Sequence, residues 1–144
     1  MGELRDIETI RLALTAAETG HLVFGTLHTS SAAKTIDRII DVFPADEKDM
    51  VRTMLSESLE GVIAQRLLRK TEGGRVTVYR IMVGTPAIRN LILENKVPHI
   101  YGMMQTGREY AMVTMDQFLQ NLAQEKLTTL EIACSVALDP EKFD

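Results

Sequence analysis

The sequence predicts an α/β domain in which an incomplete sheet, covered by helices, is followed by a helical region. Three observations lead to this prediction. The short run Leu22–Leu27 is continuously apolar, which favours a strand buried on both faces. Amphipathic segments flank this run, at about residues 4–18 and 31–43, and indicate a helix on each side. Two further strand-like runs, 62–68 and 76–83, are separated by adjacent glycines.

Local signals place the ends of the first elements. Gly20 follows the first amphipathic segment and is expected to end that helix in the C′ position. Ser30 or Ser31 is expected to cap the second helix, and Pro44 to end it. A third helix is expected over about Asp46–Glu60. In this order of elements, polar groups gather at the carboxyl end of the first strand, which is where chemistry is expected.

The middle of the chain predicts a hairpin followed by a sharp helix start. The glycines of Glu72-Gly73-Gly74 suit a tight turn, so the runs 62–68 and 76–83 are expected to pair as antiparallel strands. Thr85-Pro86 combines a hydroxyl cap with proline at the first helical position. This pair therefore predicts a helix over the stretch that follows, Ala87–Ile92.

The remaining residues predict a run of short helices. One is expected from about Pro98 to Gly107, and another around residues 115–122, where apolar residues recur at helical spacing. Thr128 and Glu131 have the spacing of a capping box, which predicts a last helix through about Ala137.

Composition limits the classes of function. The length of 144 residues suits one domain, and the net charge of -4 argues against a nucleic-acid surface, which needs clustered Lys and Arg. Cys134 is the single cysteine, so no internal disulfide is available and a cytosolic location is expected. No apolar stretch approaches the roughly 20 residues that span a bilayer, so any membrane role requires a partner.

Several motifs resemble one known family. Gly2–Asp6 with Glu8, followed by the stretch Thr19–Thr29, resembles the Walker B region and the His box of the secretion-type ATPases. Gly84–Ile92 is similar to the C-terminal signature of the PilT family, the retraction motors of type IV pili. The segments Asp37–Asp41 with Phe43-Pro44, and Thr114–Gln117, also fit that family, so the resemblance covers essentially the whole chain.

The resemblance implies a RecA-like P-loop ATPase core. Residues 1–84 would form its second half, from Walker B onward and with the hairpin, and residues 85–144 a helical C-terminal region. The family implies a homo-hexamer that binds ATP and Mg²⁺ between subunits and drives pilus retraction and twitching motility. It also implies a cytoplasmic location at the pilus base, peripheral to the inner membrane, with the inner-membrane platform protein as partner.

Glu3 matches the Walker B glutamate by position and is the predicted catalytic residue. A carboxylate can bind a hard cation or accept a proton from water, so Glu3 is expected to act on magnesium or on the attacking water, without a metal site of its own. The alternative is a favourable charge at a helix N-terminus.

Two histidines and two threonines are candidates for nucleotide contact. The spacing of His21 and His28 places them on opposite faces of a straight strand, so they cannot chelate one metal ion. In the family both belong to the His box, and His28 lies at the nucleotide end. His21 either shares that role or hydrogen-bonds backbone at the strand start. Thr26 and Thr29 could add hydroxyl contacts, although threonine is common in strands.

The signature stretch and one helical arginine are candidates for contact with other subunits or partners. In Ala87–Ile92 the apolar residues suit a core, which leaves Arg89 and Asn90 for the open face. The family needs this motif for retraction, so Arg89 is expected to serve an interface. Arg38 could reach a phosphate or pair with Asp41 on the same helix.

One family motif is missing from the sequence. No Gly-x-x-x-x-Gly-Lys-Ser/Thr loop occurs, so the backbone cradle and lysine that hold phosphates are absent. We therefore expect this chain to be the second half of a motor domain, unable by itself to bind ATP stably or hydrolyse it. The strand Leu22–Leu27 would then lack a neighbour and expose an apolar edge, which invites association.

Other functions remain open at this stage. The chain could supply Glu3 and His28 to a site that another polypeptide completes. It could instead be a non-enzymatic module that docks through Arg89 and the C-terminal helices, or a remnant without a role. The parent motor could also be a related pilus-extension or type II secretion ATPase, since these share the motifs at Glu3 and His28.

Overall fold

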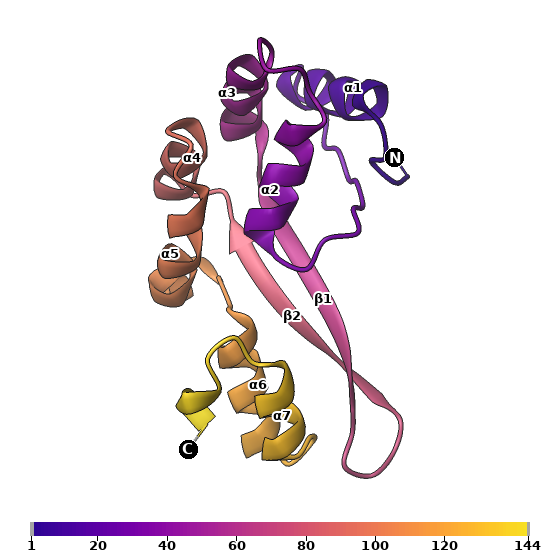
Figure 1. The fold of residues 1–144 in the computed structure, drawn as a ribbon, viewed down its shortest axis with the longest axis vertical. Helices are drawn as coiled ribbons and strands as arrows, with labels where there is room; N and C mark the ends of the chain where they lie inside the picture. Colours follow the sequence, from indigo (N-terminus) through magenta and orange to yellow (C-terminus); the bar gives the residue numbers. More distant parts are fainter. Residues whose placement is uncertain (1, 144) are drawn as a thin grey trace.

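The computed structural model describes residues 2–143 and shows an elongated α/β molecule (Figure 1). Met1 and Asp144, the outermost residues of the two predicted regions, lie outside the described residues. The elements are α1 (Ile7–Glu18), α2 (Ala32–Asp41), α3 (Lys48–Ser58), β1 (Gly61–Arg69), β2 (Arg75–Val83), α4 (Pro86–Leu93), α5 (Ile100–Thr106), α6 (Met115–Gln124) and α7 (Leu130–Val136). Short 3-10 turns flank α5 and follow α7.

The long hairpin links two groups of helices (Figure 1). Helices α1 to α5 surround one end of it, and α6 and α7 pack beside the other end. Each group has its own hydrophobic core. The first core includes Ile36, Ile88 and Ile100, and the second includes Leu119 and Ala133, all almost completely buried. Strand β2 contributes to both cores, so the hairpin holds the two ends of the molecule together.

Local signals predict the end of α1 and the start of α2. Asp6 caps α1 by accepting a hydrogen bond from the Thr9 amide, and Gly20 follows the helix with a φ of 91°. This left-handed conformation is the one that glycine adopts without strain. Ser31, one of the two predicted caps, accepts a bond from the Lys34 amide at the start of α2. The expectations for Gly20 and Ser31 are confirmed, whereas α2 ends at Asp41, before it reaches Pro44.

The predicted antiparallel hairpin is also confirmed. Strands β1 and β2 pair in register from Gly61 opposite Val83 to Arg69 opposite Arg75. Gly73 and Gly74 have φ values of 90° and 78°, so the two glycines supply the left-handed conformations that the turn requires. At the other end of β2, Thr85 caps α4 and Pro86 occupies its first turn, as predicted.

The predicted strand Leu22–Leu27 is not formed, which corrects the sequence-based expectation. This segment is extended but joins the described structure only through a single parallel bridge between Glu3 and Thr26. Leu22 and Phe24 are 76% and 72% exposed. A strand needs backbone partners along its length, and residues 2–143 provide one at Thr26 alone. The expectation that an apolar edge is exposed here is confirmed.

The C-terminal helices follow the predicted order, but the last cap was misplaced. α6 begins with a complete capping box between Thr114 and Gln117. α7 is capped by Thr129, not Thr128, because the Thr129 hydroxyl accepts the Ile132 amide. Thr128 is buried and donates its hydroxyl to the Arg69 carbonyl at 3.2 Å, which ties the helical region to β1.

Packing does not divide the chain at residues 84–85, where the sequence predicts a boundary. The first hydrophobic core continues beyond Thr85 as far as Met112, and the second takes residues from both the hairpin and the segment after Met115. Shared packing does not by itself decide where one region ends and the next begins. The division into 1–84 and 85–144 stays a prediction. Within residues 2–143, no helix combines the length and apolarity that crossing a bilayer requires.

Candidate functional site

Glu3 lies beside the segment 20–29, near the end of that segment that carries Thr26 and His28. Glu3 forms a parallel bridge with Thr26, and the neighbouring Leu4 amide donates to the Thr26 carbonyl at 2.9 Å. Gly25 leaves room for this approach, since a Cβ added there would lie 2.7 Å from the Leu4 side chain. The residue that matches Walker B and the segment that matches the His box are thus placed side by side by the backbone.

Three side chains form a small charged cluster at this tip. Glu3 Oε1 lies 3.2 Å from His28 Nε2, and Glu3 Oε2 lies 2.7 Å from Arg5 Nε. The Glu3 side chain is 27% exposed, whereas the His28 side chain is 88% exposed. The imidazole therefore faces solvent while one of its nitrogens contacts the carboxylate. The structure brings together two of the predicted site residues, Glu3 and His28, together with Arg5, which the sequence did not single out.

The two predicted threonines differ in their surroundings. Thr26 is exposed, and its backbone forms the bridge with Glu3. The Thr29 hydroxyl instead lies 2.6 Å from the Thr35 hydroxyl on α2, and Thr35 also donates to the Ser31 carbonyl. Thr29 thus belongs to the hydroxyl network at the start of α2, which shapes the loop after His28.

His21 is not part of the charged cluster. Its ring is exposed, and Nδ1 lies 3.1 Å from the Thr19 hydroxyl at the end of α1. This is a side-chain contact rather than the backbone bond that was one of the two sequence-based alternatives. Among the described residues no group of three or more His, Cys, Asp or Glu side chains is arranged to hold a metal ion.

Arg89, in the signature stretch, is folded back onto its own chain. Its Nε donates to the Gly84 carbonyl at 2.7 Å, Nη1 donates to the Glu57 carbonyl, and Nη2 lies 3.0 Å from Glu60 Oε1. Glu57 lies in the last turn of α3, where carbonyls lack helical partners and a cation is favourable. Arg89 is thus partly exposed but fastens α4 to the end of α3 and to Gly84, just after β2, and its expected role at an interface stays a prediction.

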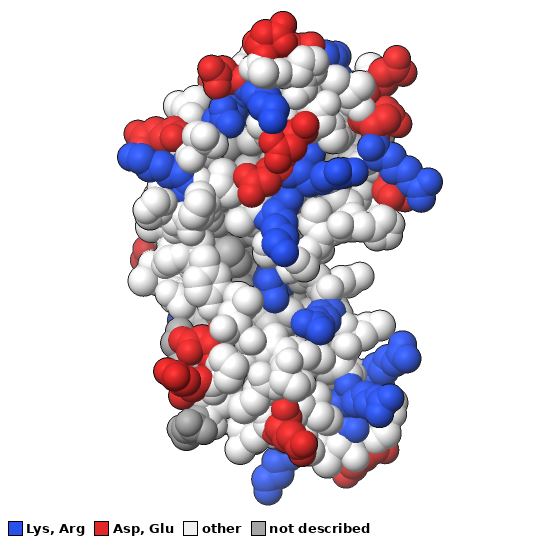
Figure 2. Space-filling model, viewed as in Figure 1, with Lys and Arg blue, Asp and Glu red and all other residues white. Residues whose placement is uncertain are grey.

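Asn90 and Arg38 do lie on the surface. Asn90 is exposed and donates to Glu94 within α4 at 3.2 Å. Arg38 is exposed on α2, and among the described residues it has no ion-pair partner. Asp41, one of its two sequence-based alternatives, pairs instead with Lys48 at 2.7 Å. Figure 2 shows basic side chains spread over the face on which α2 and the hairpin lie.

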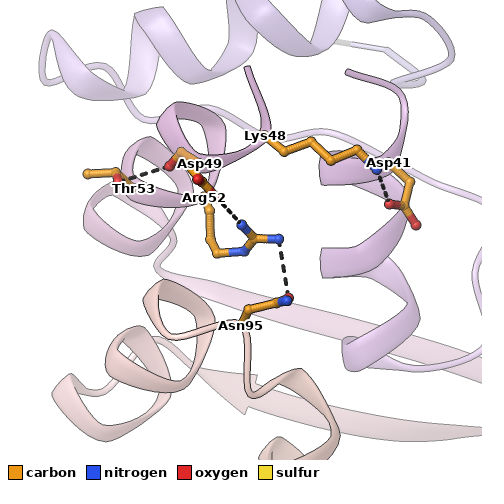
Figure 3. Close-up of polar contacts among 6 residues, drawn as sticks. All are labelled: Asp41, Lys48, Asp49, Arg52, Thr53 and Asn95. Carbon is orange, nitrogen blue, oxygen red and sulfur yellow. Dashed lines mark hydrogen bonds and ion pairs between the residues drawn. The ribbon is translucent and has the colours of Figure 1, made fainter. Parts of the chain in front are cut away.

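Sequence reasoning missed an arginine that joins α3 to the turn after α4. Arg52 Nη1 donates to Asp49 at 2.8 Å, and Nη2 donates to the Asn95 side chain at 3.2 Å (Figure 3). In Figure 3 the guanidinium points from α3 toward Asn95, while Lys48 reaches across to Asp41 on α2. Asn95 has a φ of 57°, a conformation that asparagine tolerates better than most residues. The i,i+3 spacing of Asp49 and Arg52 was the available signal.

A second arginine, Arg80 on β2, was also missed. It is only 9% exposed, and its Nη1 donates to the Ser30 carbonyl at 2.7 Å, two residues beyond His28. Burial lowers the pKa of the Arg80 guanidinium, and the nearby negative charge of Asp116 opposes that shift. A signal was present in the sequence, because Arg80 interrupts the apolar alternation Val76, Val78, Met82 of a half-buried strand.

A partial α/β core thus carries a carboxylate and a histidine at one tip, and comparison with known families gives the class of protein to which it belongs. Residues 1–74 match the family model described as "Type II/IV secretion system protein", and the chain therefore belongs to that family.

Within this family the chain is similar to pilus retraction motors. It is 62% identical, over 99% of its own length, to the type IV pilus retraction ATPase PilT of Pseudomonas aeruginosa, of which it covers 42%. It is 61% identical over 99% of its length to a twitching motility protein of Neisseria gonorrhoeae, of which it covers 38%. These matches confirm the resemblance predicted from the motifs.

The fold comparison agrees. A crystal structure of the pilus retraction motor PilT with bound ADP matches with a TM-score of 0.86 and 50% identity, covering 98% of this chain and 39% of that one. The predicted fold class is thereby confirmed. The chain spans about two fifths of the length of the curated relatives it matches.

Proposed function

We propose that this chain is the C-terminal part of an ATP-hydrolysing motor that powers type IV pilus retraction and twitching motility. The observation that carries this proposal is the contact between Glu3 and His28 at the tip of segment 20–29. It is supported by the identity of 62% to a retraction ATPase and of 61% to a twitching motility protein. The family model covers residues 1–74, whereas the similarity to the retraction ATPase extends over 99% of the chain.

In this proposal Glu3 is the catalytic carboxylate. Its two oxygens contact His28 and Arg5, so the side chain is held at one orientation while a quarter of its surface stays open. A carboxylate held in this way suits a hard cation or a water proton. In the complete motor, magnesium bound with ATP would supply charge neutralisation at the phosphates. His28 is exposed beside Glu3 and is proposed to donate a hydrogen bond to nucleotide.

Nucleotide binding requires more than this chain provides. The 144 residues contain no P-loop, so the phosphates would be cradled by another part of the motor. We propose that the chain alone neither binds ATP stably nor hydrolyses it. In the complete motor it would act in a homo-hexamer on the cytoplasmic side of the inner membrane, at the pilus base and against the platform protein. The proposed roles of Thr26, Thr29 and His21 are secondary contacts in the same site.

The C-terminal helices are proposed to serve retraction through subunit or partner contacts. Asn90 and Arg38 are exposed and would take part directly. Arg89 would act by holding α4 in place, since its donors are engaged at Gly84, Glu57 and Glu60.

Reconstitution tests the proposed function. ATP turnover is measured for the chain alone and after mixing with a polypeptide that spans the remaining part of the Pseudomonas relative. The expected result is negligible turnover by the chain alone and magnesium-dependent turnover by the mixture. Turnover by the chain alone at the rate of a complete motor would contradict the proposal, as would a mixture in which the complex forms but hydrolyses nothing.

A further inference from the structure

A charged residue lies between the two hydrophobic cores on a single strand. Side chains alternate along a strand, so Val78, Arg80 and Met82 share one face of β2, and all three are buried. Val78 belongs to the second core and Met82 to the first. Arg80 therefore lies at the junction where the two ends of the elongated molecule meet. Burying a guanidinium there is costly unless it is paired, which indicates a specific role.

On one side, Arg80 holds the tip that carries the candidate site. Its Nη1 donates to the Ser30 carbonyl at 2.7 Å. Ser30 is followed directly by Ser31, which caps α2, and is preceded by Thr29, whose hydroxyl contacts Thr35. Arg80 thus holds the loop between His28 and α2 through a hydrogen bond to a backbone carbonyl. Substitution of the Ser30 side chain would not remove that carbonyl.

On the other side, a buried carboxylate holds the C-terminal segment. Asp116 is 3% exposed and lies in the first turn of α6. One of its oxygens accepts the Leu138 amide at 2.9 Å, and the other accepts the Asp139 amide at 3.2 Å and the Tyr101 hydroxyl at 3.3 Å. Asp116 thereby anchors the chain that follows α7.

The backbone brings Asp116 close to Arg80. Ile81, the residue after Arg80, exchanges two hydrogen bonds with Val113, at 2.9 and 3.0 Å. Val113 lies directly before the capping residue of α6, so the first turn of α6 begins beside β2. The negative charge of Asp116 favours the charged form of Arg80, which agrees with this proximity.

We propose that Arg80 is a positioning residue that couples the Ser30 tip to Asp116 and the C-terminal segment, so that a change at either end is transmitted to the other. Arg80 donates to the Ser30 carbonyl and lies near Asp116 in the first turn of α6. The interpretation of this coupling as a route from bound nucleotide to the C-terminal helices rests on the proposed function, whereas the coupling itself does not. The proximity of two charged groups becomes a coupling only when perturbing one of them alters the surroundings of the other.

Amide hydrogen exchange of the 144-residue chain, followed by NMR without nucleotide, tests the coupling. The amides of Lys34 and Thr35, bonded to Ser31, report on the tip. Those of Leu138 and Asp139, bonded to Asp116, report on the C-terminal segment. Asp116→Asn is expected to speed exchange at Lys34 and Thr35, although Asp116 touches neither. A loss equivalent to one hydrogen bond corresponds to exchange faster by about fivefold to tenfold.

The converse substitution completes the test. Arg80→Met keeps an apolar stem and removes the charge, and is expected to speed exchange at Leu138 and Asp139 by a similar factor. Arg80→Lys, which restores the charge, is expected to recover part of that protection. Arg52→Met is the matched control, because Arg52 and Arg80 both have a buried Nε without a hydrogen-bond partner among the described residues. The Arg52→Met substitution should leave all four amides unchanged.

Two results would overturn the proposal. In the first, each substitution affects only the amides at its own end, which makes Arg80 and Asp116 independent anchors. In the second, amides of α3 accelerate as much as the four reporters, which indicates general destabilisation. If Arg80→Met does not fold, Asp116→Asn and Arg80→Lys decide the question alone. Because no nucleotide is present, failure of the ATPase reconstitution leaves this result unaffected.

Discussion

Glu3 and His28 meet at 3.2 Å although 24 residues separate them in the sequence, including the whole of α1. The contact arises because the chain leaves Glu3, forms α1, and returns along segment 20–29 to pair Thr26 with Glu3. Helix α1 therefore acts as a crossover that brings a carboxylate and an imidazole to the same tip. The sequence motifs identify the two residues, and the structure shows that they are in contact.

Arg89 is expected to contribute to stability. Arg89→Ala removes donors to Gly84, Glu57 and Glu60, and leaves the Gly84 carbonyl in a partly buried position without this partner. The free energy of unfolding, from urea titration, should fall by about 1–3 kcal/mol. Arg38→Ala, at an exposed arginine, should change it by less than about 0.5 kcal/mol. Equal effects of the two substitutions would contradict the assigned contacts.

The capping box at the start of α6 is a second stability determinant. Thr114 is 2% exposed, and its hydroxyl accepts the Gln117 amide while the Gln117 side chain accepts the Thr114 amide. Thr114→Ala should lower the free energy of unfolding by about 1–2 kcal/mol. Thr106→Ala, at an exposed threonine whose hydroxyl only donates to Met103, is the control. A Thr114 variant as stable as this control would argue against the cap.

Asp6 and Asp37 should give stability opposite dependences on pH. The Thr9 amide and hydroxyl lower the pKa of Asp6, so its contribution is present above its unfolded pKa of 3.8 and is lost as pH falls through the lower folded pKa. Burial, with the nearby charge of Asp41, raises the pKa of Asp37 against the opposing effect of Arg52. Stability therefore falls as pH rises from 3.8 through the folded pKa of Asp37.

Thermal melts between acid and neutral pH separate the two carboxyl groups. Asp6→Asn keeps a capping side chain but should remove part of the loss of stability seen in acid. Asp37→Asn should instead raise the melting temperature at neutral pH relative to the original chain. If both variants change the melting temperature at neutral pH in the same direction, the pKa shifts of Asp6 and Asp37 are not opposite and the prediction is wrong.

The exposed apolar segment is expected to cause association. Leu22 and Phe24 are 76% and 72% exposed on a segment that, among the described residues, forms a β-bridge only at Thr26. In sedimentation velocity, the chain should show concentration-dependent association that a Leu22→Ser/Phe24→Ser variant reduces. Leu12→Ser, at a leucine 65% exposed on α1, is the control and should leave association unchanged. Association that persists equally in both variants would place the contact elsewhere.

Local sequence signals predicted most of the elements, and long-range contacts account for the errors. Gly20, Ser31, Thr85 and the glycine pair at 73–74 act within a few residues, so their effects could be inferred directly. The strand Leu22–Leu27 failed because a strand depends on neighbours that need not be local. Thr128 was mistaken for a cap because its contact with Arg69 lies 59 residues away.

In the candidate site, too, local motifs could be recognised in the sequence, whereas long-range contacts could not. Glu3 and His28 could be proposed because they match motifs, yet their mutual contact and the part played by Arg5 required the structure. Arg89 was expected on the surface because helical periodicity identifies a face but not the path of a long side chain. Arg80 and Arg52 contact residues 50 and 43 positions away, which no periodicity reveals.

The most direct test of the central claim is ATP turnover by the reconstituted motor carrying Glu3→Gln. If Glu3 is the catalytic carboxylate, turnover should fall at least about a hundredfold while the complex still assembles. Glu18→Gln, at an exposed glutamate in the last turn of α1, should retain full turnover. Turnover by the Glu3→Gln motor equal to that of the Glu18→Gln motor would contradict the account, because the tip formed by Glu3 and His28 would then have no catalytic part.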